Sequence, residues 1–410
     1  MFVESLKCIE CGREYAPNAI VYTCEACGGL LDVTYDYSRL EASQLLEIWS
    51  RRPLSVWKYQ ELLPADSSRK VSLGEGGTGL HRCSRLASKL GVKELYVKNE
   101  GENPTGSFKD RGMTIGVTKA VELGAKATAC ASTGNTSASL AAYSAKAGLP
   151  CLVIVPSGKI ARGKLVQAVA HGAKVLAIKG SFDDALREVR KLCEKRGLYL
   201  LNSVNPFRLE GQKTLAYEVC EQLGRRVPDR IVLPVGNAGN ISAIWKGFKE
   251  LRELGITRET PKMMGVQAEG AAPFAHMILQ NLDKLTPLDK PETVASAIRI
   301  GAPVNWSKAK AAVVESKGGV TVVSDEEIVD AQRELARLEG LFVEPASAAS
   351  IAGLVKMLEQ GVISRDETIV CVATGHGLKD PDIVVRFYEE PFEVESSRVE
   401  EVVGRVLGCG

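Results

Sequence analysis

Several features are scarce in this chain of 410 residues, and each scarcity argues against a class of function. Four histidines leave little for histidine-based metal sites or catalytic triads. The 52 Lys and Arg residues nearly balance the 50 Asp and Glu residues, and a net charge of +2 argues against bulk nucleic-acid or membrane-surface binding. No apolar run approaches the roughly 20 residues of a bilayer span, and residues 1–5 lack an export signal. We therefore expect a cytoplasmic protein with no nucleic-acid and no membrane partner.

Cysteine is present in a pattern at the start of the chain. Two C-x2-C pairs, each followed by glycine, are separated by twelve residues; the cysteines are Cys8, Cys11, Cys24 and Cys27. Two such pairs can aim four thiolates at one tetrahedral zinc ion. Glycine after each pair allows the tight turn that points backbone N–H groups at sulfur. The pattern predicts a zinc-ribbon-like module over 1–37, with short strands at Tyr15 and 20–22.

Two other interpretations of the four cysteines stay open, namely reduced thiols without metal and two disulfides. Disulfides belong to secreted chains, and nothing in the sequence indicates secretion. The seven remaining cysteines are scattered without a pairing pattern, which is typical of a reducing compartment. Residues 1–40 hold three basic and six acidic side chains, which argues against binding to phosphate backbones. We expect the module to be a structural cap held together by metal.

From residue 94 onward, short apolar segments alternate with segments of helical spacing. The predicted strands are 95–97, 127–131, 151–155, 175–178, 231–235, 321–323 and 368–373. The predicted helices include 108–123, 136–147, 161–170 and 328–338, the last one preceded by a capping box of Ser324 and Glu327. Continuously apolar strands between amphipathic helices predict an α/β chain with parallel sheets covered on both faces. Ligands then bind at the carboxyl ends of the strands.

Four loops at such strand ends carry chemistry. In the loop 103–113, Lys109 lies near a helix start, where the partial positive charge favours a neutral amine. A neutral amine can form a Schiff base with an aldehyde cofactor, although the local sequence alone favours an ordinary solvated surface lysine. The loop 131–139 places five hydroxyls around Asn135 and is either an anion cradle or a capped helix start.

The other two loops are rich in glycine. The loop 236–240 (G-N-A-G-N) fits neither a Walker A nor a dinucleotide pattern, so it predicts a site for a phosphate monoester or a plain turn. The loop 372–381 contains Thr374, whose hydroxyl can meet a ring nitrogen or simply form a turn. Each loop alone leaves its two interpretations open.

Taken together, the four loops resemble those of the fold-type II pyridoxal-phosphate enzymes. The resemblance covers about residues 70–390 and is carried by N-P-T-G-S-F-K-D-R-G at 103–112 and T-G-H-G-L-K-D-P at 374–381. The loop G-N-A-G-N at 236–240 looks like a variant of the phosphate loop of these enzymes. Within them, the chain is most similar to the threonine synthases of the zinc-ribbon-bearing type.

The resemblance implies a role for each matching residue. It implies pyridoxal 5′-phosphate as cofactor, with Lys109 as the Schiff-base lysine, Asn135 at the 3′ oxygen and Thr374 at the pyridine nitrogen. The cofactor phosphate would lie against Gly236, Asn237, Ala238, Gly239 and Asn240. The substrate carboxylate would lie against Ser132, Thr133 and Thr136, and the substrate phosphate against Ser203, Asn205 and Arg208. A surface arginine at a helix start is the alternative interpretation of Arg208.

The resemblance also implies two doubly wound parallel-sheet domains. The larger, phosphate-binding domain would comprise 38–98 and 200–390, the smaller one with Lys109 would comprise 99–199, and 391–410 would form a tail. The implied protein is a homodimer that converts O-phosphohomoserine and water to threonine and phosphate. A cysteate synthase acting on O-phosphoserine and sulfite, a dehydratase, and a non-catalytic zinc-ribbon binding protein are the alternatives.

Overall fold

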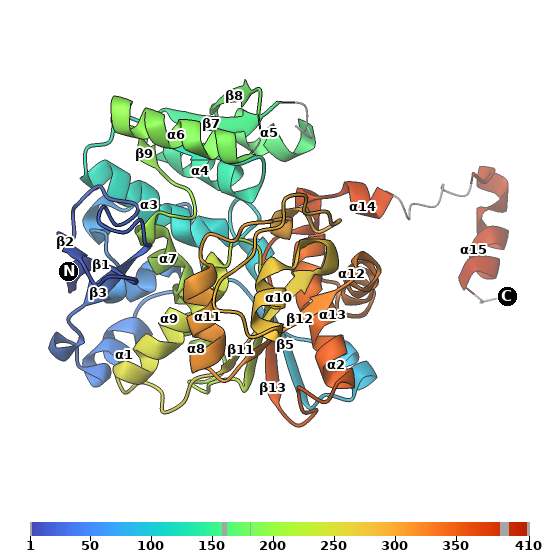
Figure 1. Cartoon of the computed structure of the whole chain (residues 1–410). Helices are drawn as coiled ribbons and strands as arrows, with labels where there is room; N and C mark the ends of the chain where they lie inside the picture. The colour runs from blue at the N-terminus through green and yellow to red at the C-terminus, as the bar shows by residue number, and fades with distance from the viewer. Residues whose placement is uncertain (1, 158–161, 181, 386–392, 408–410) are drawn as a thin grey trace. The chain divides into compact units, whose positions relative to one another are not determined.

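The computed structural model describes residues 2–157, 162–180, 182–385 and 393–407. The chain forms two compact units, Met1–Asp380 and Pro381–Gly410. The first unit contains three sheets (Figure 1). The second contains the short helix α14 (Asp382–Val385) and the helix α15 (Val399–Leu407). The domain boundaries given above for the first 390 residues stay predictions.

The N-terminal module (residues 3–37) is an antiparallel sheet in the order β2-β1-β3. Its strands are β1 (Val3–Cys8), β2 (Glu14–Tyr15) and β3 (Leu31–Tyr35). The predicted strand at Tyr15 is confirmed, but the one at 20–22 is wrong, because that segment has no strand pairing. Its Tyr22 instead packs edge-on against Tyr199 and accepts a hydrogen bond from the backbone N–H of Leu200.

The larger sheet has the order β12-β11-β10-β13-β5-β4 and is parallel except for the antiparallel edge pair β4–β5. Its strands are β4 (Leu80–Arg82), β5 (Glu94–Asn99), β10 (Arg230–Pro234), β11 (Lys262–Ala268), β12 (Gly319–Val323) and β13 (Thr368–Ala373). The predicted strands 95–97, 231–235, 321–323 and 368–373 correspond to four of these. The fully buried residues of β10 explain its uninterrupted apolar sequence, since helices cover both faces. The strands β4 and β11 were not predicted.

The smaller sheet is parallel throughout, in the order β8-β7-β6-β9. Its strands are β6 (Thr128–Ala131), β7 (Cys151–Pro156), β8 (Lys174–Ile178) and β9 (Tyr199–Leu200), of which the first three match predicted segments. The helices α4 (Asn135–Lys146), α5 (Arg162–Ala170) and α6 (Phe182–Arg196) alternate with these strands (Figure 1). Residue 161 of the predicted helix 161–170 lies outside the described residues.

Helices connect and cover the two parallel sheets. They are α1 (Ala42–Ser50), α2 (Ser84–Leu90), α3 (Lys109–Glu122), α7 (Pro206–Gln212), α8 (Thr214–Gln222), α9 (Gly239–Glu253), α10 (Pro273–Leu279), α11 (Trp306–Glu315), α12 (Asp325–Glu339) and α13 (Pro345–Glu359). The predicted capping box is confirmed at α12, where Ser324 and Glu327 bond reciprocally to each other's backbone. Among the described residues, no helix has both the length and the apolar character of a membrane span.

Candidate active site

The segment before Lys109 is held against the end of β13. Ser107 and Gly375 form an isolated antiparallel bridge. The backbone N–H of Phe108 donates to the carbonyl of Thr374 at 3.0 Å, and that of His376 donates to the carbonyl of Gly106 at 2.9 Å. Two of the sequence loops, although more than two hundred residues apart, therefore meet at one strand end, with Lys109 at the first position of α3.

The amine of Lys109 is half-buried and, among the described residues, has neither a hydrogen-bond nor an ion-pair partner. Its contact is with the ring of Phe108, whose centroid lies 4.0 Å from Nζ. Burial lowers the pKa of Lys109 to about 7; the positive charge of Arg208 lowers it too, whereas the negative charge of Glu344 opposes the shift. Near neutral pH a large share of this amine is therefore neutral, as a nucleophile for an aldehyde requires.

Glu344 is a charged residue of the site to which the sequence analysis gave no role, as is Lys379. Its buried carboxylate accepts hydrogen bonds from the amide of Asn135 at 3.0 and 3.2 Å and from the hydroxyl of Thr374 at 3.3 Å. Burial raises the pKa of Glu344, partly offset by those bonds and by the charges of Lys379 and Lys109. A single glutamate between apolar residues and a helix-starting proline was the available signal in the sequence.

The two residues after Lys109 hold its loop in place. The carboxylate of Asp110 accepts from the N–H and the hydroxyl of Thr105, both at 2.7 Å, and from Ser139 of α4. Burial raises the pKa of Asp110 to about 6 despite these bonds. Arg111 is fully buried and pairs with Glu100 at 2.6 Å and with Glu218 at 2.7 Å, so it joins α3 to α8. The motif K-D-R-G thus combines one reactive side chain with two structural ones.

The loop after β6 presents its polar groups at the same strand end. The amide of Asn202 pairs with both the N–H and the carbonyl of Ala131 at 2.9 Å, which anchors the loop where β6 ends. Asn135, at the start of α4, reaches Glu344 across the site. Ser132, Thr133 and Thr136 remain partly exposed, and the Ser132 hydroxyl accepts from the N–H of Gly134 at 3.2 Å.

The loop 236–240 leads from β10 into α9. Ala238 adopts a left-handed conformation with φ +63°, which is uncommon without glycine, and the N–H groups of the first turn of α9 follow it. A Cβ on Gly236 would lie 3.1 Å from Cα of Ile298, so glycine permits this close approach. The side chain of Asn237 accepts from the backbone of Val304. Both polar atoms of the Asn240 amide are buried without a partner in the described structure, as in a site built for an anion.

The predicted substrate-phosphate residues differ in what they contact. Arg208 is buried on α7 and its Nε has no partner among the described residues, while burial lowers the pKa of its guanidinium to about 10. Asn205 caps α7, with its Oδ1 accepting from Phe207 and its Nδ2 donating to the carbonyl of Leu200. Ser203 is partly exposed, and its carbonyl accepts from Asn305. Arg208 is thus a buried cation for which the described residues supply no ion-pair partner.

The charges of the site are unbalanced. Among the described residues, the cations Lys109, Arg208 and Lys379 outnumber the carboxylates that act on them, which are Glu344 beside Lys109 and Lys379 and Asp110 beside Lys379. Lys379 donates to the carbonyl of Thr105 at 2.9 Å and to Gln167, neither of which is charged. Buried charges are ordinarily paired, so this arrangement is suited to ligands that carry several negative charges.

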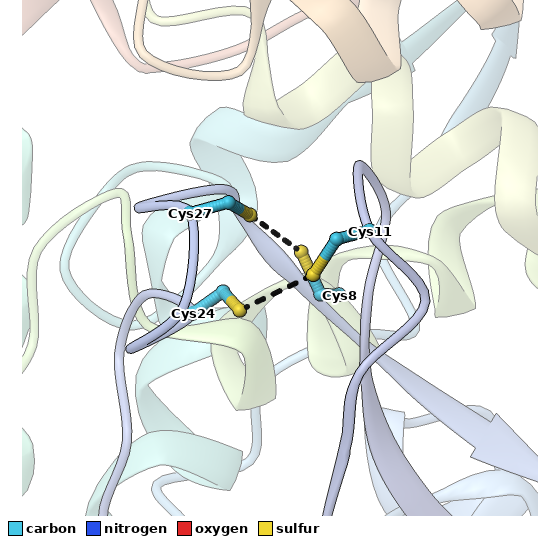
Figure 2. Close-up of side chains that lie close together, drawn as sticks. All are labelled: Cys8, Cys11, Cys24 and Cys27. Carbon is cyan, nitrogen blue, oxygen red and sulfur yellow. Dashed lines mark hydrogen bonds between the residues drawn. The ribbon is translucent and has the colours of Figure 1, made fainter.

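The four cysteines of the N-terminal module converge on one point (Figure 2). All four sulfurs lie within 4.8 Å of one another, with Cys8 and Cys27 at 3.5 Å and Cys11 and Cys24 at 3.6 Å. A tetrahedral zinc site with Zn–S bonds of about 2.3 Å places its sulfurs about 3.8 Å apart, whereas a disulfide needs about 2.05 Å. Gly12 and Gly28 both have φ +74°, which confirms the tight turns predicted after each pair. The cluster can hold a metal ion.

Known proteins resemble this chain along nearly its whole length. The family model described as pyridoxal-phosphate dependent enzyme matches residues 71–375. Threonine synthase of Methanocaldococcus jannaschii is 59% identical over 402 residues, 98% of each chain. That of Methanosarcina acetivorans is 59% identical over 392 residues, 96% of each chain. That of Bacillus sp. is 49% identical over 353 residues, which are 86% of this chain and 97% of the relative.

Solved structures of lower identity share the fold. Threonine deaminase isoform 2 from Solanum lycopersicum superposes with a TM-score of 0.66 at 23% identity, covering 84% of this chain and 92% of its own. Maize serine racemase also superposes with a TM-score of 0.66, at 19% identity, covering 87% and 99%. At these identities the likeness concerns the fold, which is α/β with parallel sheets as the sequence predicted.

Proposed function

Because this chain belongs to the family of pyridoxal-phosphate-dependent enzymes, we propose that it acts as a threonine synthase, converting O-phosphohomoserine and water to threonine and phosphate. The observation that carries the assignment is the amine of Lys109. It is half-buried, has no polar partner among the described residues and has a pKa lowered to about 7. An amine in that state at the end of a parallel strand is suited to capturing an aldehyde. The cysteate synthase, dehydratase and non-catalytic alternatives have no observation in their favour.

The residues around Lys109 fit pyridoxal phosphate. The unpaired amide of Asn240 and the first turn of α9 offer donors for the cofactor phosphate. Asn135 and Thr374 each bond to Glu344, whose charge acts on Lys109, and their polar groups can hold the 3′ oxygen and the ring nitrogen. When bound, the cofactor supplies an aldehyde for the substrate amine and a ring that withdraws electrons from the substrate carbons.

The side chains then divide the remaining work. With substrate bound to the cofactor, Lys109 would be a free amine that can take protons from Cα and Cβ and return protons at Cγ and Cα, while water adds at Cβ. Thr374 offers the ring nitrogen a neutral hydroxyl instead of a carboxylate, so it does not impose a proton there. Arg208 is buried and has no ion-pair partner in the described part of the chain, so it is suited to the phosphate that leaves from Cγ. Ser132, Thr133 and Thr136 offer hydroxyls for the substrate carboxylate.

The activity assay tests the function directly. The purified full chain, loaded with pyridoxal phosphate, should form threonine and release phosphate from O-phosphohomoserine in equal amounts. The Lys109→Ala variant should form neither, and borohydride should attach the cofactor to the wild-type chain at Lys109 but not to the variant. Product formation from O-phosphoserine and sulfite, with none from O-phosphohomoserine, would instead identify a cysteate synthase.

Three further properties belong to the same proposal. The four-cysteine cluster would hold a structural zinc ion, because its sulfur spacing suits a tetrahedral site. The cysteines that the structure describes are free thiols, which supports a cytoplasmic location. The assembly would be a homodimer, a property to be measured by light scattering.

A further inference from the structure

The N-terminal module is bonded to the helix that carries Arg208. The hydroxyl of Tyr35, at the end of β3, donates to Oε2 of Glu210 on α7 at 2.7 Å, although 175 residues separate the two. Oε1 of the same carboxylate accepts from Nζ of Lys246 on α9 at 2.7 Å. Lys246 in turn donates to the carbonyl of Val33 at 2.6 Å and lies 3.2 Å from Asp32. Strand β3, α7 and α9 therefore share one set of charged contacts.

This set is a balanced network of three carboxylates and three ammonium groups. Its members are Asp32, Glu210 and Glu250 with Lys213, Lys246 and Lys308. Glu210 and Lys213 are fully buried and pair at 2.5 Å. Removing one partner from such a network leaves a buried charge uncompensated, so its geometry is strongly determined. The network joins β3 of the module to the elements that surround the phosphate-binding candidates.

The apolar packing follows the same path. Leu31, Val33 and Tyr35 of β3 belong to one continuous hydrophobic cluster with Phe207 of α7 and Leu201, at the end of β9. Cys8 and Cys24 of the four-cysteine cluster are buried in the same core. The module is thus part of the core around α7, and the chain from β9 to α7 depends on it for support.

The helix α7 has seven residues and leads into α8 through Lys213, which is itself in helical conformation, while its other sides pack against α3 and the module. On one side α7 lies against α3, where a Cβ on Gly112 would come within 2.8 Å of the carbonyl of Arg208. On another side Glu210 bonds to the module. Arg208 lies on this short helix and its charge acts on Lys109.

We propose that β3 of the N-terminal module positions Arg208 through the contact between Tyr35 and Glu210, so that the module determines how tightly the substrate phosphate binds. Tyr35 and Asp32 are positioning residues, since they touch neither the cofactor residues nor the substrate residues of the proposed site. This inference rests on the proposed role of Arg208 as the phosphate ligand. It assigns to the module a part in substrate affinity in addition to its part in stability.

The test uses the full chain loaded with pyridoxal phosphate, so that the cofactor's own phosphate occupies its site. Tyr35→Phe removes the hydroxyl donor but keeps the ring in the core. We expect the KM for O-phosphohomoserine and the inhibition constant of inorganic phosphate to rise about 10-fold, as for a lost hydrogen bond to a charged group, with kcat nearly unchanged. Lys308 lies on α11 and pairs with Asp32, so Lys308→Met should also raise both constants.

Thr34→Val is the matched control. Thr34 lies in the same strand, but its hydroxyl bonds to Ser5 inside the module, so the variant should leave both constants unchanged. In an Arg208→Ala background, Tyr35→Phe should add no further loss of phosphate affinity, because its effect passes through Arg208.

The outcomes distinguish the proposed phosphate site at Arg208 from the proposed role of the N-terminal module. If Arg208→Ala leaves phosphate inhibition unchanged, the proposed phosphate site is wrong. If Arg208→Ala weakens phosphate binding but Tyr35→Phe and Lys308→Met lower only the melting temperature, the module is merely structural and the present inference fails. Equal losses from Tyr35→Phe in the wild-type and Arg208→Ala backgrounds would also overturn it.

Discussion

The amide nitrogen of Asn135 lies 3.0 and 3.2 Å from the two carboxylate oxygens of Glu344, although 209 residues separate them in the chain. Asn135 begins α4, beside the smaller sheet, and Glu344 immediately precedes α13, beside the larger one. This contact joins the two parallel-sheet regions at the site. It places the carboxylate of Glu344 beside both Asn135 and Thr374, the two residues proposed to hold the 3′ oxygen and the ring nitrogen of the cofactor.

Glu344→Gln should allow the chain to capture the cofactor at lower pH. The negative charge of Glu344 raises the pKa of Lys109, so its removal should lower that pKa further below about 7. Because capture requires a neutral amine, the inflection in the rate of cofactor binding should move toward acid by about 1 pH unit. Stopped-flow absorbance measures the rate. The exposed substitution Glu326→Gln is the control, and an unchanged inflection would show that Glu344 does not act on Lys109.

Lys109→Met should stabilise the cofactor-free protein at low pH. The folded state holds this amine with a pKa of about 7, whereas the unfolded chain keeps it protonated up to about 10.5. Between these two pKa values the unfolded state therefore binds more protons than the folded state. The free-energy cost of burying the charged amine is full below pH 7 and disappears as the pH rises toward 10.5. We expect the free energy of unfolding to rise by roughly 1–3 kcal/mol at pH 6, since the amine is half-buried, and by little at pH 10.

Urea denaturation at the two pH values measures this difference. Lys126→Met, at an exposed lysine, is the control and should give the same free energy as the wild type at both. A variant that is less stable than the wild type at pH 6 would contradict the claim that burial destabilises the charged amine of Lys109.

Arg111→Met should destabilise the chain strongly without touching the cofactor. It would leave Glu100 and Glu218 as buried carboxylates that lack their main partner, at a cost of about 3–5 kcal/mol. Chemical denaturation of the cofactor-free chain gives the free energy, with the exposed Arg69→Met as control. A loss below about 1 kcal/mol would mean that Lys98, which already bonds Glu218 at 2.8 Å, compensates for the missing charge.

Cys11→Ser should remove the metal from the N-terminal module. We expect one zinc ion per wild-type chain and none in the variant, measured by native mass spectrometry together with elemental analysis. Since the module shares its core with the smaller sheet, the variant should lose at least ~3 kcal/mol of unfolding free energy. Cys83→Ala, at a cysteine far from the cluster in sequence, should keep the metal. If the wild-type protein contains no metal and is nevertheless fully stable, the cluster consists of four thiols and the zinc prediction is wrong.

Local patterns carried much of the prediction. The helix start at Lys109, the capping box of Ser324 and Glu327, and the tight turns at Gly12 and Gly28 each depend on a few neighbouring residues. Such features can be recognised in a sequence because backbone geometry and hydrogen bonding act over one or two turns. The strand pattern could be recognised equally well in buried strands such as β10, whose residues are all apolar except Arg230 at its start.

The sequence by itself determined the parallel α/β class, the grouping of the four N-terminal cysteines and the loops that meet at the strand ends. Only the tertiary structure determined that the carboxylate of Glu344 lies in the site, which residues pair with Arg111, and that the N-terminal module is attached to α7. These contacts join residues far apart in the chain, and a glutamate or an arginine looks the same in a sequence whether it lies in solvent or in a core. Whether a charge is buried, and against which opposite charge, is settled when distant segments pack together, because burial in the folded core is what makes pairing necessary.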